Sequence, residues 1–191
     1  MRVHTVNKAQ KTAGTCVHCQ QPVLAGEGYS WAAPFRSHRR IVRHTACGPF
    51  RSSQIASNDK LSALYAIQET IEDWIESSAN DEFTLDDAKA VMDEAGDAAE
   101  EVASQYEESA SSIEDGFGHS TYQSEEMTEY AEQCNDWAST LHDALDSVDE
   151  LDEDEEDEDE PLTDEQKAAK IDEWRQEVLS AMQDAANECP L

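Results

Sequence analysis

Two pairs of residues near the start of the chain have the side chains and the spacing of a metal site. The first pair is Cys16 and Cys19, the second is His44 and Cys47, and two residues separate the members of each pair. A Cys-x-x-Cys turn lets both sulfur atoms reach one ion, and the second pair closes the loop around it. Because three thiolates and an imidazole are donors that zinc prefers, the sequence predicts one bound Zn²⁺.

Four protein ligands predict a structural ion rather than a catalytic one, since a catalytic zinc keeps one position for water or substrate. Two alternatives stay open. The Cys-x-x-Cys motif could be a redox pair, as in thioredoxin-like proteins. A neighbouring histidine could also replace His44, namely His4, His18 or His38, although His44 alone keeps the two-residue gap to Cys47.

Charged residues divide the chain into two unlike parts. Residues 1–60 contain 9 Lys or Arg and 2 Asp or Glu, a net charge of +7, whereas residues 61–191 contain 4 and 42, a net charge of −38; together these give −31. Three zinc-bound thiolates with their ion lower the first figure by about one, so the N-terminal part stays basic. The acidic part repels phosphate and anionic lipid over roughly a Debye length of 8 Å.

The basic part offers a candidate surface for nucleic acid, because cations that pair with phosphate occur there beside aromatic rings on which bases stack. The predicted nucleic-acid-binding residues are Lys8, Lys11, Trp31, Arg36, Arg39, Arg40 and Arg43. In the competing interpretation the arginines are solvated or pair with the acidic part of the chain, and the aromatic residues form a small core, namely Tyr29, Trp31 and Phe35.

The ligand pattern resembles the PARP-type zinc finger of poly(ADP-ribose) polymerases and of the DNA ligases that carry such a finger. The likeness covers about a quarter of the chain and consists of Lys8 and Lys11 ahead of Cys16-x-x-Cys19, a loop with Pro22, Val23 and Gly26, and basic residues before His44-x-x-Cys47. It implies a structural zinc on these four ligands and a surface that grips DNA ends or nicks. The interval between the pairs is shorter here, and no aromatic residue directly precedes His44.

The order of the two parts carries a second resemblance. A basic finger ahead of an acidic helical hairpin that contains Gly116-Phe117-Gly118-His119 is similar to small uncharacterised proteins encoded by bacteriophages of actinobacteria. For a phage-encoded protein, this resemblance implies the cytoplasm of the host as the location.

Helical periodicity begins after Asn58, where apolar residues recur every three or four positions. A second helix of about 30 residues is predicted from a capping box at Thr84 to about Asp115. A third is predicted from a cap at Ser124 to Leu151, at nearly heptad spacing. Because Gly116-Phe117-Gly118 interrupts the pattern, we expect the second and third helices to form an antiparallel hairpin.

A fourth amphipathic helix is predicted after a capping box of Thr163 and Gln166. Large aromatic residues at helical spacing are usually core residues, so we expect Trp74, Trp137 and Trp174 to be buried. Cys134 lies in an apolar stripe and is predicted to be buried, Cys189 is predicted to be a free thiol, and Phe117 is expected to pack back on the hairpin.

The predicted fold is therefore a small zinc-stabilised β-rich finger followed by a mainly α-helical body, with an antiparallel helical hairpin or bundle and coiled-coil-like pairing. Four segments follow from the patterns: a basic finger at 1–57, an acidic helical domain at 58–148, an acidic linker at 149–161 and a C-terminal amphipathic helix at 162–191. The linker is expected to be solvated because its like charges repel one another.

Two functions are compatible with these features. The first is a nonenzymatic zinc finger that binds nucleic acid, either DNA ends or single strands, with the acidic body tuning that binding. The alternative is an acidic interaction protein, or DNA mimic, that binds a basic protein while the zinc is purely structural. With no signal-peptide pattern and no long apolar run, we expect a cytoplasmic protein without membrane contact, and heptad spacing also allows a homodimer.

Overall fold

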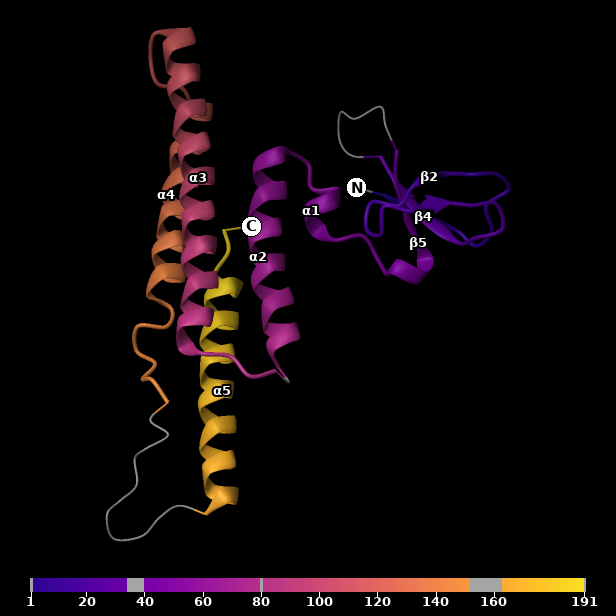
Figure 1. Cartoon of the computed structure of the whole chain (residues 1–191). Coiled ribbons are helices and arrows are strands. Elements are labelled where there is room, and N and C mark those ends of the chain that lie inside the picture. The colour runs from indigo at the N-terminus through magenta and orange to yellow at the C-terminus, as the bar shows by residue number, and fades with distance from the viewer. Residues whose placement is uncertain (1, 34–39, 80, 152–162, 191) are drawn as a thin grey trace. The chain divides into compact units, whose positions relative to one another are not determined.

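The computed structural model of the protein describes residues 2–33, 40–79, 81–151 and 163–190. The chain forms two compact units, residues 1–66 and 67–191, and the boundary between them falls within a helix that begins at Asp59 (Figure 1). The predicted boundary at residues 57 and 58 lies just before that helix. Among the described helices, none is both long enough and apolar enough to cross a membrane.

The first unit is built on a three-stranded antiparallel sheet with the order β1-β4-β5. Its strands are β1 (Val3–Val6), β4 (Tyr29–Ala32) and β5 (Ile41–His44). The short strands β2 (Gly14–Thr15) and β3 (Pro22–Val23) pair beside it, and η1 (Thr45–Cys47) and α1 (Ser52–Ile55) follow. The sequence has two β-prone runs, at residues 28–33 and 40–44, and the structure confirms them as β4 and β5, whereas β1 is an additional strand.

The hydrophobic core that the described residues form beside this sheet is small. Cys16, Val23 and Val42 form its buried centre, and the aromatic rings of Tyr29 and Trp31 are only partly buried against it. So few apolar side chains supply little of the free energy that orders a module of this size, because small domains without a sufficient core need a disulfide or a metal. The core is therefore consistent with a metal-dependent fold.

The second unit consists of helices whose starts follow the sequence signals. Asn58 accepts a hydrogen bond from the Leu61 N–H (2.8 Å) and caps α2 (Asp59–Ser78), which ends in this unit. Both predicted capping boxes are confirmed, at Thr84 for α3 (Leu85–Phe117) and at Thr163 for α5 (Asp164–Asn187). These caps satisfy N–H groups that the first helical turn leaves without partners.

The third predicted helix differs from its prediction at both ends. The N-cap of α4 (Tyr122–Asp143) is Thr121, and Ser124 is the third residue of its capping box rather than the cap. The helix ends at Asp143, eight residues before Leu151, although Leu145 and Val148 are buried. Turns after Asp143 therefore keep these apolar side chains in the core, and periodicity alone reads such turns as helix.

Helices α3 and α4 lie side by side as the predicted antiparallel hairpin (Figure 1). The buried face of α3 consists largely of small residues, namely Ala88, Ala95, Gly96, Ala99, Ala103 and Ala110. A Cβ atom at Gly96 would lie 2.5 Å from the His142 ring, so the glycine leaves room for that side chain of α4. Helix α5 joins the pair through a hydrogen bond from the Trp137 indole N–H to the Ala185 carbonyl (2.9 Å).

The expected core residues divide into two groups. Trp137 and Cys134 are buried, as predicted. Trp74 and Trp174 are half-buried and both contact Phe83, with ring centroids 5.2 and 5.5 Å from its ring, so for them the prediction was only partly right. The three rings form a satellite cluster rather than the centre of the core.

Two further predictions concern Phe117 and Cys189. Phe117 is 65% exposed at the end of α3, so the expectation that it packs back on the hairpin is wrong. Cys189 is a free cysteine, as predicted, but it is partly buried, and burial raises the pKa of its thiol to about 12. It is therefore protonated near neutral pH. Most of the predicted acidic linker, residues 152–161, lies outside the described residues.

Candidate metal centre

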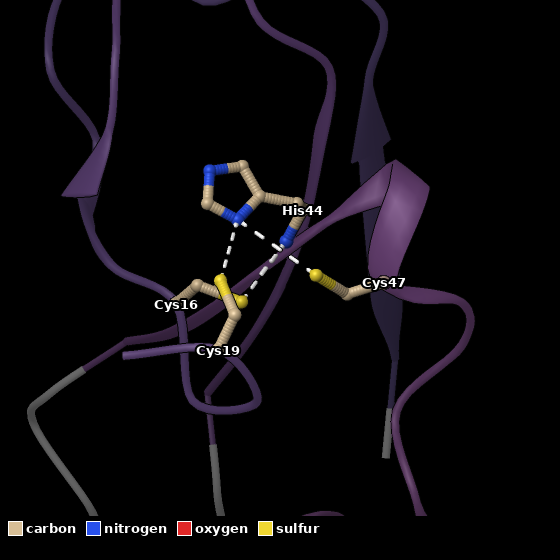
Figure 2. Close-up of side chains that lie close together, drawn as sticks. All are labelled: Cys16, Cys19, His44 and Cys47. Atoms are coloured by element: carbon tan, nitrogen blue, oxygen red, sulfur yellow. Dashed lines mark hydrogen bonds between the residues drawn. The ribbon is translucent and has the colours of Figure 1, made fainter. Parts of the chain in front are cut away.

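The side chains of Cys16, Cys19, His44 and Cys47 converge at one point of the first unit (Figure 2). One donor atom of each lies within 4.8 Å of all the others. His44 Nδ1 is 3.3 Å from Cys19 Sγ and 4.0 Å from Cys47 Sγ. The four residues could hold one metal ion, and they are the four that the sequence predicted.

The first ligand pair sits on a tight turn after β2. The N–H of Gln20 donates to the Cys16 carbonyl (3.0 Å), and the N–H of Cys16 donates to the Gln21 carbonyl (2.8 Å). Gln20 closes the turn with a φ of 58°, a left-handed conformation that costs a residue with a side chain about 1–2 kcal/mol. This geometry aims both sulfur atoms at the same point.

The second ligand pair is fixed to the sheet. His44 is the last residue of β5, and Cys47 is the last residue of η1, which follows at once. Thr45 donates its N–H to the Gly28 carbonyl (3.0 Å), and a Cβ atom at Gly28 would lie 2.7 Å from the Thr45 hydroxyl. Gly28 therefore lets β4 and η1 approach closely enough to hold His44 and Cys47 in place.

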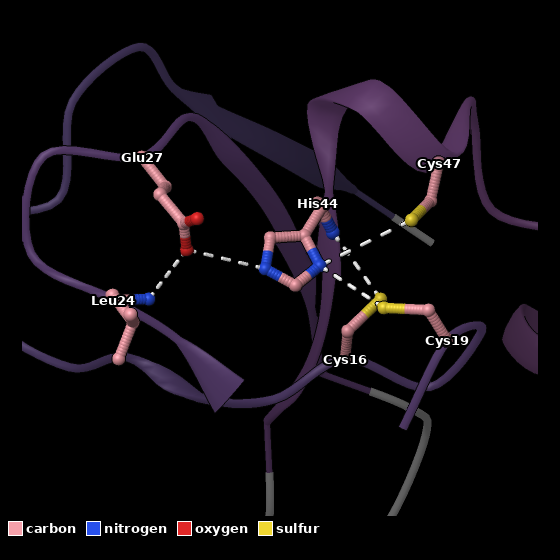
Figure 3. Close-up of polar contacts among 6 residues, drawn as sticks. All are labelled: Cys16, Cys19, Leu24, Glu27, His44 and Cys47. Atoms are coloured by element: carbon pink, nitrogen blue, oxygen red, sulfur yellow. Dashed lines mark hydrogen bonds and ion pairs between the residues drawn. The ribbon is translucent and has the colours of Figure 1, made fainter. Parts of the chain in front are cut away.

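Glu27 orients the histidine ligand (Figure 3). Its carboxylate oxygen lies 3.3 Å from His44 Nε2 and also accepts a hydrogen bond from the Leu24 N–H (2.6 Å). A carboxylate at one imidazole nitrogen keeps the proton there and leaves the other nitrogen, here Nδ1, free to bind a metal. The sequence analysis missed this role, although Glu27 is the one acidic residue among residues 1–58 and that isolation was a usable signal.

Arg43 has a different place from the one predicted. Its side chain is only 5% exposed, and its guanidinium donates to the Cys47 carbonyl (3.0 and 2.6 Å) and to the Gln54 side chain (3.1 Å). A guanidinium committed in this way is not on the surface where phosphate would reach it. Arg43 braces the backbone of a ligand residue, and we leave it out of the candidate nucleic-acid surface.

The ligand side chains compete for protons when no cation is between them. Burial raises the pKa of Cys16, but hydrogen bonds from the backbone of Cys19, His44 and His18 outweigh it and lower that pKa to about 6. Contact with Cys16 raises the pKa of His44, and burial together with contacts to Cys19 and Cys16 raises the pKa of Cys47 to about 11. A bound cation would let all three thiols ionise, so metal binding should release protons.

The other described histidines that could have replaced His44 lie outside the ligand cluster. His4 stacks on Trp31 at a centroid distance of 4.3 Å, and His18 is exposed outside the ligand cluster. His38 lies outside the described residues. Among the residues that the structure describes, His44 is therefore the histidine of the cluster.

Four of the predicted nucleic-acid-binding residues come together on one face of the first unit. Lys8, Lys11, Trp31 and Arg40 line a cavity of about 410 Å³ beside the sheet. Arg36 and Arg39 lie outside the described residues. Neither Lys8 nor Lys11 forms a hydrogen bond or an ion pair with any residue that the structure describes.

Trp31 combines the two roles that the sequence left open. Its ring packs against the small core, and it also lies between His4 and Arg40, whose guanidinium carbon is 4.1 Å from the ring centroid. His4 is its cross-strand neighbour on β1, whereas Arg40 leads into β5 on the opposite side of β4. The indole faces are therefore already covered.

Comparisons with protein-family models, with curated proteins and with solved structures found no match for the chain.

Proposed function

We propose that this is a nonenzymatic zinc-finger protein that binds nucleic acid through its basic N-terminal unit. The observation that carries the proposal is the Cys16, Cys19, His44 and Cys47 cluster in the same unit as a cavity lined by the exposed cations Lys8, Lys11 and Arg40. The acidic helical unit tunes this binding. The resemblance of the ligand pattern to PARP-type fingers supports the same function.

Zinc is the proposed ion because its preferred geometry fits the donors. Tetrahedral bonds of about 2.3 Å to sulfur and about 2.0 Å to nitrogen place neighbouring donors roughly 3.5–3.8 Å apart. The donor distances of 3.3 and 4.0 Å at His44 lie on either side of that range, so small side-chain movements suffice. Four protein ligands complete the shell, which supports a structural ion without a position for substrate.

The cations of the cavity support binding to phosphate. Lys8, Lys11 and Arg40 are all exposed, and Glu27, the one acid of residues 1–58, is in contact with His44. Each phosphate that such a cation neutralises releases condensed counterions, so affinity falls with salt. The proposal thus includes a strong dependence of binding on ionic strength.

The helical unit competes with nucleic acid for the same cations. It is joined covalently to the basic unit, and from Ala90 to Gln166 the chain contains neither Lys nor Arg. Tethering gives its carboxylates a high effective concentration near the basic surface, which is greatest at low salt. The intact chain should therefore bind nucleic acid more weakly than residues 1–66.

The experiment is a titration of DNA and RNA with zinc-loaded residues 1–66 and with the intact chain, each at two salt concentrations. Zinc-dependent dispersion of the amide NMR signals first checks that the fragment folds. Salt-sensitive binding by the fragment, weakened in the intact chain, supports the proposal. A folded fragment that binds neither nucleic acid at low salt contradicts it.

A second candidate function is that the helical unit presents carboxylates to a basic protein in place of DNA phosphates. It is favoured by the hairpin, because α3 and α4 together contain 17 Asp or Glu and one Lys. Two aromatic side chains near the turn between these helices add apolar contact area, namely Phe117 (65% exposed) and Tyr122 (78% exposed). In this case the N-terminal unit has only a structural role.

Binding of an arginine-rich peptide by the intact chain tests this candidate. We expect salt-dependent binding that weakens when Phe117 and Tyr122 are both changed to Ser, because the charge of the hairpin is unchanged and only apolar contact is lost. Equal binding by the double variant and the unaltered chain would leave only nonspecific charge attraction and would remove the support for a defined surface.

A further inference from the structure

The cavity on the Trp31 face is lined by both cationic and apolar side chains. Its volume is about 410 Å³, and its walls include Val6, Ala13 and Val42 besides the cations. Pockets of 300–1,000 Å³ with mostly apolar walls and a few placed polar groups are typical small-molecule sites. A bare phosphate would leave the apolar walls without a partner, whereas a nucleotide supplies both an anion and a ring.

The stack beside the cavity determines where a base can lie. His4 covers one face of Trp31 and the Arg40 guanidinium covers the other, so the indole offers no open face. Arg40 itself lines the cavity and is exposed. A planar guanidinium can stack on a ring on each side, and unpaired bases are known to stack on arginine planes.

We propose that this cavity binds one unpaired nucleotide of a single strand or strand end, with its base on the face of the Arg40 guanidinium opposite Trp31 and its phosphates at Lys8 and Lys11. This inference depends on the proposed nucleic-acid function and adds the subsite to it. The base would extend the His4–Trp31–Arg40 stack by one member. In a duplex the base is already stacked between its neighbours, so single strands should be preferred.

The test separates stacking from charge. The full chain, loaded with zinc and labelled with 5-fluorotryptophan, is titrated at low salt with a short oligothymidylate and with an abasic phosphodiester of the same length. The Trp31 fluorine signal is assigned with Trp31→Phe, and the signal of Trp137, which is buried in the other unit, serves as the internal control. A duplex of equal length completes the set.

Arg40→Lys is the decisive variant because it keeps the positive charge and removes the plane. We expect about tenfold weaker binding of the oligothymidylate, the order of magnitude of one stacked base, and no change for the abasic strand. Lys8→Gln with Lys11→Gln should weaken both strands and reduce their salt dependence. Arg2→Lys, the same change at an exposed arginine that does not line this cavity, is the matched control.

The outcomes are distinguishable. Equal effects of Arg40→Lys and Arg2→Lys, or a duplex that binds more tightly than the single strand, would overturn the subsite and leave the nucleic-acid function standing. A folded chain that binds none of the three ligands, while residues 1–66 also bind none, would overturn both. A shift of the Trp31 signal with the oligothymidylate alone supports the subsite.

Discussion

The two units of this protein obtain their folds from different sources. In the part of the first unit that the structure describes, the buried centre of the sheet core consists of Cys16, Val23 and Val42, and four donor side chains meet beside it. In the second unit a full set of buried side chains fills the space between helices, among them Trp137, Met92 and Leu141. Metal coordination can replace burial only where the donors converge, so the two units should respond differently to the same perturbation.

The two units also carry net charges of opposite sign. Residues 1–60 have a net charge of +7 and residues 61–191 a net charge of −38. The basic surface stays available to a ligand only if its cations do not pair with the carboxylates of the acidic unit at the ionic strength used. The stability of each unit can therefore be perturbed separately, and binding to phosphate is expected only of the basic unit.

Removal of the proposed zinc ion should have the largest effect. Structural zinc contributes roughly 10 kcal/mol or more to the folding of small fingers, so a chelator should unfold the first unit and leave the second intact. Maleimide labelling followed by mass spectrometry should then modify Cys16, Cys19 and Cys47, while Cys134 stays protected and the helical circular dichroism persists. Loss of the helical signal together with the finger would contradict the independence of the two units.

Trp137→Ala should have the next largest effect, and in the opposite unit. The change removes a fully buried indole and its hydrogen bond to the Ala185 carbonyl, which should cost about 3–5 kcal/mol of unfolding free energy. Denaturant unfolding followed by circular dichroism measures it, with zinc stoichiometry as a second readout that should stay at one. Tyr122→Ala, at an exposed position, is the control and should change stability by less than about 0.5 kcal/mol.

Glu27→Gln tests whether the Glu27 carboxylate orients His44 for metal binding. The variant weakens the acceptor at His44 Nε2, and loss of such a partner typically lowers metal affinity by about 10- to 100-fold. Competition with a zinc indicator dye measures the affinity. Glu76→Gln, an exposed acid on α2, is the matched control. An affinity equal to that of the control would mean that Glu27 does not orient the ligand.

Thr84→Ala tests a smaller contribution, the cap of α3. Loss of an N-cap threonine should cost about 1 kcal/mol. Hydrogen bonds from the Thr84 backbone and hydroxyl hold the pKa of Asp87 below its ordinary 3.8, so this carboxylate stabilises the fold above that pH and loses its effect as the pH falls through its lowered pKa. The difference between Thr84→Ala and the unaltered chain should shrink in acid.

Denaturant unfolding at neutral pH and near pH 3, with carboxyl NMR titration of Asp87, checks this prediction. Ser139→Ala, where the hydroxyl bonds to a carbonyl within α4, is the control and should show no such pH dependence. An Asp87 pKa that does not rise in Thr84→Ala would show that the capping box is not formed.

Local signals in the sequence were sufficient to predict the candidate metal ligands and most helix starts. A gap of two residues, as after Cys16 and after His44, lets both side chains of a pair reach one ion across a short turn. Thr84 with Asp87, and Thr163 with Gln166, likewise interact within one helical turn. Ser124 was misread as a cap because Thr121 and Ser124 are both small polar residues that can cap a helix, and only the backbone shows which of them lies outside the helix.

The sequence by itself therefore determined the features that depend on residues close together in the chain, namely the candidate ligand pairs, the caps, the amphipathic stripes and the division of charge. Only the tertiary structure decided which of the long charged side chains are buried and which are exposed. Arg43 and Arg40 look alike in sequence, yet one is buried under the Cys47 carbonyl and the other lies over Trp31 beside a cavity. The reason is physical, because burial and hydrogen-bond partners depend on contacts between distant segments, as the pairing of Glu27 with His44 also shows.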